Sequence, residues 1–119
     1  KEAFAIVDGG GAFLGLALAP GIDREEGQAE LGYVVAAEAR GRGVATRALS
    51  LLTDWALDER GLQRLTLLIS IDNHASKRVA ARNGYVLEGV LRSLAFKQGR
   101  RADTELWSLL PSDRAASRT

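Results

Sequence analysis

Residues 40–45 read Arg-Gly-Arg-Gly-Val-Ala, and they separate a stretch of strand-like alternation from one of helical periodicity. Before the turn, Leu31, Tyr33 and Val35 share one face of the pattern, which is typical of a β-strand. After it, apolar residues recur at i, i+4, i+7 and i+8, which predicts an amphipathic helix beginning near Val44. The members of this stripe are Val44, Ala48, Leu51, Leu52, Trp55 and Ala56. The fold assignment depends on this order of strand, glycine turn and helix.

The predicted helix begins without a side chain that could cap it. No Ser, Thr, Asp or Asn occupies positions 40–43, so the first N–H groups of the helix have no local acceptor. Gly41 and Gly43 leave the backbone bare, while three nearby arginines add positive charge with no acidic residue between positions 39 and 53. Bare N–H groups, the helix dipole and guanidinium groups together suit a phosphate. The alternative interpretation is a tight turn closed by water, with solvated arginines.

The composition narrows the classes of function. The chain has 119 residues, enough for one hydrophobic core. Its formal charge of +1 gives no overall attraction to nucleic acid or to a membrane, so neither is expected as a partner. The absence of Cys excludes disulfide bonds and thiol catalysis, and with a single His we expect no metal site. We find no signal-peptide or membrane-spanning pattern, so the expected location is the cytoplasm.

Three strands are predicted before the glycine turn. Residues 3–7 and 12–19 flank a glycine-rich turn and are expected to form a hairpin. Pro20-Gly21 is expected to end the second strand, and the polar residues 21–28 to form an exposed loop. The third strand is expected at 29–36.

The second half of the chain continues the alternation of strands and helices. The first helix is expected to end before Gly61. A buried strand, a short helix and two further strands are expected at 65–71, 74–83, 85–96 and 104–110. The order β-β-β-α-β-α-β-β predicts one mixed α/β (α+β) domain over 1–111, mostly antiparallel with one β-α-β crossover. Residues 112–119 are expected to be a frayed tail.

Several motifs resemble those of one superfamily. Arg40-x-x-Gly43-x-Ala45, after a Glu-Leu-Gly-Tyr strand, is similar to the acyl-CoA pyrophosphate loop of the GNAT superfamily of N-acetyltransferases. A longer set resembles the RimJ/RimL branch, whose best-known members acetylate the N-termini of ribosomal proteins. This set comprises Trp55, Gly61-Leu-Gln-Arg64, Asn73-x-x-Ser76, Asn83-Gly-Tyr85, Glu88-Gly89 and Ser108-Leu-Leu-Pro111. The resemblance covers residues 2–111 and implies a GNAT-like fold.

One departure from the family concerns the start of the chain. Related domains open with a strand and one or two helices that form part of the acceptor-binding wall, and the chain shows no counterpart of them. The resemblance therefore implies a complete cofactor site. Whether this chain binds an acceptor and turns it over does not follow from the resemblance.

The resemblance implies acetyl-CoA as the co-substrate. Its pyrophosphate would lie on the turn, and the preceding strand would bind its pantetheine arm through backbone hydrogen bonds. The turn residues are Arg40, Gly41, Arg42, Gly43, Val44 and Ala45, and the strand residues are Val34, Val35 and Ala36. Cationic side chains of the second helix could reach the 3′-phosphate or form a solvated face. They are Lys77, Arg78 and Arg82.

Two residues of the second helix region have two interpretations each. By resemblance, Asn73 would hydrogen-bond the pantetheine arm and Ser76 would lie near the cofactor sulfur. Alternatively, Asn73 is simply the N-cap of the helix, with Ser76 in its first turn. In some relatives a tyrosine one turn further along acts as the acid for the departing thiolate. This chain has Ala80 there, so Ser76 or a water would have to take that role.

Glu30 is the candidate general base. Some relatives have a carboxylate on this strand that takes the proton of an ammonium acceptor. An α-amino group has a pKa of about 8, so a weak base is enough to remove its proton. The alternative is a charged residue on a solvated strand face. Most of the rate acceleration would come from alignment of the amine with the thioester, and an N–H near Val35 would be the oxyanion donor.

The expected function is direct acetyl transfer from acetyl-CoA to an amine, without a covalent enzyme intermediate. The acceptor is a protein N-terminal α-amino group or a small-molecule amine, and the protein is a monomer or a homodimer. A non-catalytic acyl-CoA-binding module is the alternative from another class. A Rossmann-type nucleotide enzyme fits less well, because the turn lacks the full three-glycine spacing.

Overall fold

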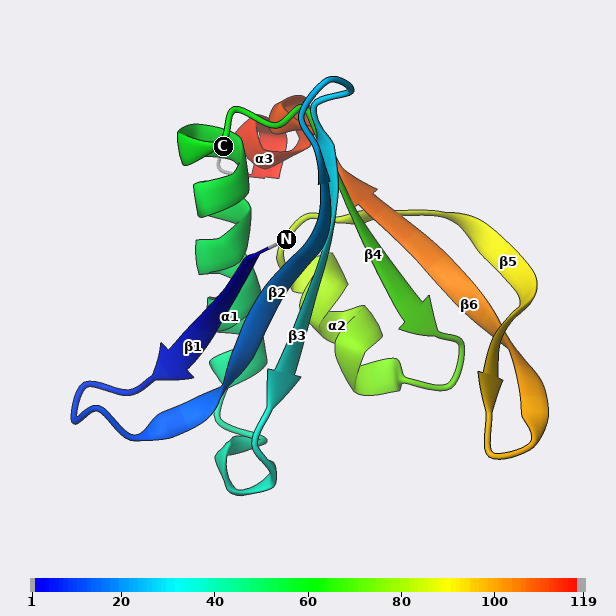
Figure 1. Ribbon diagram of the computed structural model, residues 1–119, viewed down its shortest axis with the longest axis horizontal. Helices are drawn as coiled ribbons and strands as arrows, with labels where there is room; N and C mark the ends of the chain where they lie inside the picture. Colours follow the sequence, from blue (N-terminus) through cyan, green and yellow to red (C-terminus); the bar gives the residue numbers. More distant parts are fainter. Residues whose placement is uncertain (1, 118–119) are drawn as a thin grey trace.

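The computed structural model describes residues 2–117, which form a six-stranded sheet with accompanying helices (Figure 1). The elements in chain order are β1 (Glu2–Val7), β2 (Phe13–Asp23), β3 (Gln28–Val35), the 3₁₀ turn η1 (Ala37–Ala39), α1 (Val44–Asp54), the π-helical turn η2 (Trp55–Glu59), β4 (Arg64–Ser70), α2 (His74–Arg82), β5 (Val86–Lys97), β6 (Arg100–Leu109) and α3 (Pro111–Ser117).

The strands lie in the order β1-β2-β3-β4-β6-β5, and among them only β3 and β4 are parallel. The crossover between these two strands contains α1. The predicted mixed, mostly antiparallel fold with one β-α-β unit is thereby confirmed.

The second strand is longer than predicted. Pro20 and Gly21 do not end it: the pairing register shifts between Leu18 and Gly21, and β2 continues to Asp23, opposite Gln28. An irregularity of this kind accommodates a proline, because proline has no N–H to give to the ladder. The predicted loop over 21–28 is therefore wrong for residues 21–23 and 28, which belong to strands, and is confirmed for the turn at 24–27.

The chain after Leu110 is helical where a frayed tail was expected. Pro111 occupies the first position of α3, where its missing N–H costs nothing. Asp113 accepts a hydrogen bond from the N–H of Leu110 at 3.0 Å. The guanidinium of Arg114 contacts Asp54 at 3.2 Å and Asp58 at 2.6 Å, so α3 is tied to the end of the first helix. The expectation is wrong for 112–117, while residues 118 and 119 lie outside the described residues.

The core lies between one face of the sheet and the two helices α1 and α2. Alternate residues of β2, β3 and β4 contribute to it together with both helices. Leu49 of α1 is fully buried, whereas Leu51, which was predicted to face the core, is 55% exposed. Trp55 is half-buried at the edge of the core. Ala48, Leu52 and Ala56 of the predicted stripe are buried, so the spacing identified the side of the helix that meets the sheet and was wrong for Leu51.

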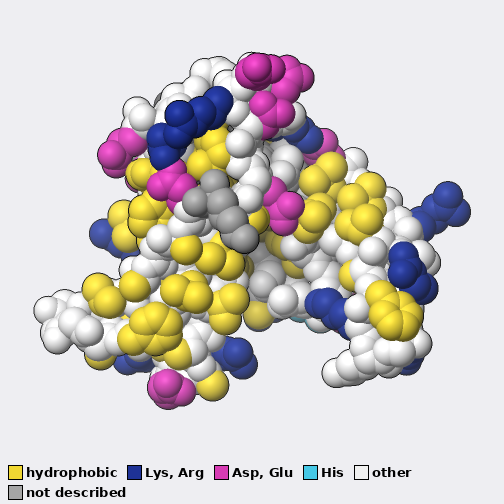
Figure 2. Space-filling model, in the orientation of Figure 1, with side chains coloured by type: hydrophobic (Ala, Val, Ile, Leu, Met, Phe, Trp, Pro, Cys, Tyr) yellow, Lys and Arg dark blue, Asp and Glu magenta, His cyan; other side chains and the backbone are white. Residues whose placement is uncertain are grey.

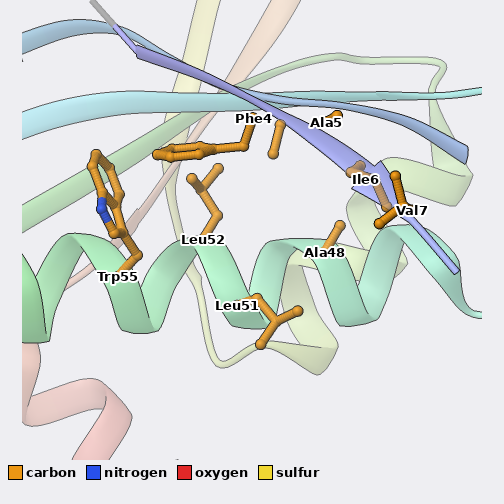
Figure 3. A pocket seen from close by; sticks show the side chains of 9 residues that line it. Phe4, Ala5, Ile6, Val7, Ala48, Leu51, Leu52 and Trp55 are labelled. Atoms are coloured by element: carbon orange, nitrogen blue, oxygen red, sulfur yellow. The ribbon is translucent and has the colours of Figure 1, made fainter. Parts of the chain in front are cut away.

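An apolar groove lies between the edge strand β1 and α1 (Figure 3). It has a volume of about 350 Å³, and the rings of Phe4 and Trp55 meet edge to face at its end, with centroids 5.0 Å apart. Leu51 and Leu52 line it from the helix side. Among the described residues no titratable side chain lines the groove, so acid–base chemistry must lie elsewhere.

The other face of the sheet is largely uncovered. Val34 of β3 is 57% exposed and Leu68 of β4 is 41% exposed, and β5 adds further apolar side chains. Figure 2 shows apolar side chains over β1 and its neighbouring strands and again over β5. In the part of the chain that the structure describes, no helix has the length and apolar character needed to span a membrane.

Candidate functional site

The sheet opens between β3 and β4. These strands pair at three positions only, of which Glu30 opposite Thr66 is the last. Beyond that point β3 follows β2 to Val35 and β4 follows β6 to Ser70, so the inner edges diverge (Figure 1). Because neither inner edge has a strand partner there, the gap offers unpaired backbone groups to an extended ligand.

The hydrogen-bond pattern shows which backbone groups face this gap. The N–H of Ala36 donates to the carbonyl of Leu14 at 2.7 Å, so it is already used by β2. Since backbone groups alternate along a strand, Val34 also directs its N–H toward β2, whereas Tyr33 and Val35 direct theirs into the gap. Of the three predicted pantetheine-binding residues, only Val35 presents its N–H to a ligand.

The glycine turn lies at the open end of the gap. Gly43, with φ of 73°, precedes α1 directly, and no side chain caps the helix. The first turn of α1 contains no acidic residue, and the N–H groups of Val44, Ala45 and Thr46 come too early to have helical acceptors. Gly41 also has a positive φ, of 79°. The uncapped helix start predicted from the sequence is confirmed.

A pocket of about 300 Å³ extends from this turn toward α2. It is lined by Val35, Ala39, Arg40, Gly41, Gly43, Val44, Ala45, Thr46, Ala75, Arg78, Val79 and Arg82. Arg40 donates through Nε to the carbonyl of Val35 at 3.3 Å and so bridges the turn and the strand. Arg42 is exposed and is not part of this lining. The pocket thus joins bare N–H groups to guanidinium groups, which suits a phosphate.

The three cationic residues of α2 have different surroundings. Arg78 and Arg82 line the pocket, whereas Lys77 turns to the sheet, where its Nζ lies 3.0 Å from a carboxylate oxygen of Glu105. Trp107 also donates to Glu105, at 2.9 Å. Burial raises the pKa of Glu105, but the bonds from Lys77 and Trp107 outweigh it and hold that pKa below its usual range. Lys77 therefore fixes α2 on β6, and only the two arginines face the pocket.

Asn83 connects the two helices that wall the pocket. Its Nδ2 donates to the carbonyl of Thr46 at 3.2 Å and to that of Val79 at 3.0 Å. Thr46 belongs to the uncapped first turn of α1. This connection holds the end of α2 against the glycine turn that precedes α1.

Asn73 and Ser76 are brought together at the start of α2. The Asn73 side chain accepts a hydrogen bond from the N–H of Ser76 at 3.2 Å, which is the N-cap role that the sequence left open. Ser76 Oγ in turn accepts a bond from the hydroxyl of Tyr33 at 3.3 Å. Burial raises the pKa of Tyr33 above its usual 10.0. Sequence reasoning missed Tyr33, and its only signal was a position on the helix-facing side of the strand.

The two predicted catalytic residues lie on opposite faces of the sheet. Glu30 is exposed on the uncovered face, at the last paired position of β3, whereas Ser76 lies on the helix-covered face beside Tyr33. Their side chains do not meet. The gap between β3 and β4 separates them, so a ligand in the gap would have a carboxylate on one side and a hydroxyl on the other.

The fold and site define an α+β domain that can receive an extended, phosphate-bearing ligand between two diverging strands. Residues 1–86 match the family of the acetyltransferase (GNAT) domain. The chain belongs to the GNAT acetyltransferase family, whose members use acetyl-CoA as co-substrate.

Individual relatives agree with this assignment. YdaF of Bacillus subtilis (strain 168) is 31% identical over 100 residues, a match that covers 84% of this chain and 55% of YdaF. The ribosomal-protein-serine acetyltransferase of Escherichia coli (strain K12) is 32% identical over 80 residues, 67% of this chain and 45% of that protein. The chain thus spans about half the length of the curated relatives it matches.

A solved structure shows the same fold. Mutant forms of the spermidine/spermine N-acetyltransferase SpeG from Vibrio cholerae superpose with a TM-score of 0.93 at 23% sequence identity. The superposition covers 98% of this chain and 70% of SpeG. At this identity the likeness concerns the fold alone.

Proposed function

We propose that this chain carries the cofactor-binding and catalytic centre of an N-acetyltransferase that moves the acetyl group of acetyl-CoA directly to an amine. The observation that carries the proposal is the uncapped start of α1 at the open end of the β3–β4 gap. A phosphate group and an extended amide chain can be bound there at the same time, and coenzyme A contains both.

The cofactor site follows from the free groups of the pocket. The N–H groups of the turn, from Gly41 to Ala45, bind the pyrophosphate, and Arg78 and Arg82 neutralise its charge or that of the 3′-phosphate. The amide N–H groups of the pantetheine arm donate to carbonyls on the inner edge of β3, at Tyr33 and Val35, which leaves the N–H of Val35 for the reaction. Asn73 keeps its Nδ2 donor for the same arm, because its cap uses only Oδ1.

The chemistry uses both faces of the gap. The amine nitrogen attacks the thioester carbonyl carbon, the N–H of Val35 stabilises the developing oxyanion, and the C–S bond breaks with its electron pair going to sulfur. Glu30 accepts the ammonium proton, directly or through a water, on the uncovered face. Ser76 stabilises the departing thiolate from the helix side, and this thiolate takes up the second proton that the nitrogen releases when the amide forms. Alignment of amine and thioester supplies most of the acceleration.

A protein N-terminal α-amino group is the acceptor we favour. A relative at 32% identity is named a ribosomal-protein-serine acetyltransferase, whereas the spermidine enzyme shares the fold at 23% identity. An α-amino group, with a pKa of about 8, also loses its proton to a single carboxylate more readily than an alkylammonium with a pKa of about 10. A small-molecule amine remains the second candidate.

Calorimetry and thiol release test this proposal together. Acetyl-CoA should bind the chain, and N-terminal peptides should release free CoA thiol faster than spermidine does. Binding without release for every acceptor would make the chain an acyl-CoA-binding module. Absence of binding at millimolar acetyl-CoA would refute both functions.

A further inference from the structure

The hydroxyl of Tyr33 lies against Ser76 although 43 positions separate the two residues in the chain. Tyr33 comes from β3 and Ser76 from the first turn of α2, so the contact spans the helix-covered side of the gap. We infer that Tyr33 is a positioning residue, whose hydroxyl fixes the Ser76 side chain so that the Ser76 hydrogen points to the sulfur of the departing thiolate. The inference rests on the proposed function and adds a residue to it.

The contact between the two hydroxyl groups, from two different elements, carries the argument. Tyr33 donates and Ser76 Oγ accepts, at 3.3 Å. A serine hydroxyl has one hydrogen, so Ser76 still has that hydrogen to donate elsewhere. Without a fixed partner, a serine in the first turn of a helix samples several rotamers, and its hydroxyl can turn back to a backbone carbonyl. The Tyr33 bond favours one rotamer, while the Asn73 cap holds the Ser76 backbone.

Tyr33 is suited to hold Ser76 and poorly suited to be the acid itself. Its partly buried ring is rigid and anchored on β3, directly beside the gap. Burial raises its pKa, so the phenol keeps its proton and stays a donor across the working pH range. Ala80, one turn beyond Ser76, is fully buried and has no donor to offer. Ser76 donates a hydrogen bond to the thiolate, and the amine proton leaves on the Glu30 side.

The chain contains a matched control for Tyr33. Tyr85 is a buried tyrosine that likewise has one hydroxyl partner, Thr53 at 2.7 Å, but this pair joins Tyr85 to the buried side of α1, in the core. Tyr85→Phe therefore removes the same atom from a similar setting outside the gap. It should reduce stability without changing the chemistry of bound CoA.

The test measures the ionisation of the thiol of bound CoA, which requires no acceptor. Ultraviolet absorbance of the thiolate is followed against pH in the complex of the chain with CoA. Ser76→Ala should reduce the ionisation constant of the bound thiol about tenfold, the effect expected from the loss of one hydrogen bond to a charged atom. Tyr33→Phe should reduce it by nearly the same factor, and the double variant by no more than either single one. Tyr85→Phe should leave it unchanged.

Turnover gives a second readout once a peptide acceptor is found. Tyr33→Phe and Ser76→Ala should lower kcat by similar, non-additive factors while the Kd for CoA stays the same. Multiplicative effects in the double variant, or an unaltered thiol ionisation in Tyr33→Phe, would overturn the inference and leave the proposed function intact. Failure of the wild-type chain to bind CoA would instead overturn the proposed function, and the inference with it.

Discussion

Gly43 and Gly61 both have a positive φ, of 73° and 65°, and they differ in their surroundings. A Cβ built on either one meets no protein atom within 4 Å. At Gly43 that open space is the pocket at the start of α1, whereas Gly61 lies at the turn before β4. A substitution at these two positions therefore separates the cost of backbone strain from the cost of obstructing a ligand.

Gly43→Ala should weaken the binding of CoA at least tenfold, because its methyl group occupies the space that a phosphate needs. Both Gly43→Ala and Gly61→Ala should lower the free energy of unfolding by about 1–2 kcal/mol, since each places a side chain in the left-handed region. Calorimetric titration and thermal unfolding of the two variants measure both effects. Equal Kd values in the two variants would contradict a phosphate site at Gly43.

The single residues of the site differ in how far the sequence predicts them. The uncapped start of α1 is a local property of positions 40–43, and the structure has it as predicted. The bond between Tyr33 and Ser76 is long-range, so no spacing in the sequence indicates it. The placement of Glu30 and Ser76 on opposite faces likewise depends on which side of the sheet α2 covers.

At the scale of elements, the pocket depends on how α1 and α2 are held together. Asn83 is the last residue before Gly84, and its side chain donates to carbonyls in both helices. Lys77 fixes the other end of α2 on β6 through Glu105. The walls of the pocket are thus set by two polar contacts at the ends of one short helix.

Asn83→Ala should cost about 1 kcal/mol of stability through the loss of its hydrogen bonds, and it should weaken CoA binding because the first turn of α1 loses its support. Asn83→Asp keeps the shape and places a carboxylate against two carbonyl oxygens, so it should be less stable than Asn83→Ala. Thermal unfolding and calorimetric titration measure the two effects. An Asn83→Asp variant as stable as the wild type would show that the Thr46 contact does not matter.

The elements themselves are well predicted in kind and order, and less well in extent. Strand alternation and helical periodicity are local, so they identified the six strands and the helices α1 and α2. The continuation of β2 past Pro20 depends on its pairing with β3, and this pairing cannot be inferred from the residues near Pro20 alone. Helix α3 likewise depends on a distant contact, from Arg114 to the carboxylates of Asp54 and Asp58.

At the scale of the whole molecule, one polar cluster ties the three strands on the far side of the gap. The two terminal guanidinium nitrogens of Arg64 on β4 contact the carboxylate of Glu88 on β5, at 2.6 and 3.1 Å. Ser108 of β6 donates to the same carboxylate. The hydrogen bonds from Arg64 and then from Ser108 lower the pKa of Glu88 from its usual 4.5 to about 2. Because a change in pKa on folding couples stability to pH, acid should weaken the whole sheet through this group.

Stability should fall with falling pH, because the pKa of Glu88 is lower in the folded protein than in the unfolded chain. The stabilisation by Glu88 is complete above pH 4.5 and is lost as the pH falls from 4.5 through about 2. Glu88→Gln cannot be protonated, so the stability difference between wild type and variant should shrink across that window. Arg64→Gln should flatten the same part of the wild-type curve, because Arg64 is the main cause of the low pKa. Urea unfolding at a series of pH values measures this. Added salt should reduce the stability difference between wild type and Glu88→Gln, because the Arg64–Glu88 pair is partly exposed. A stability difference that stays constant down to pH 2 would mean that the cluster does not hold these strands together.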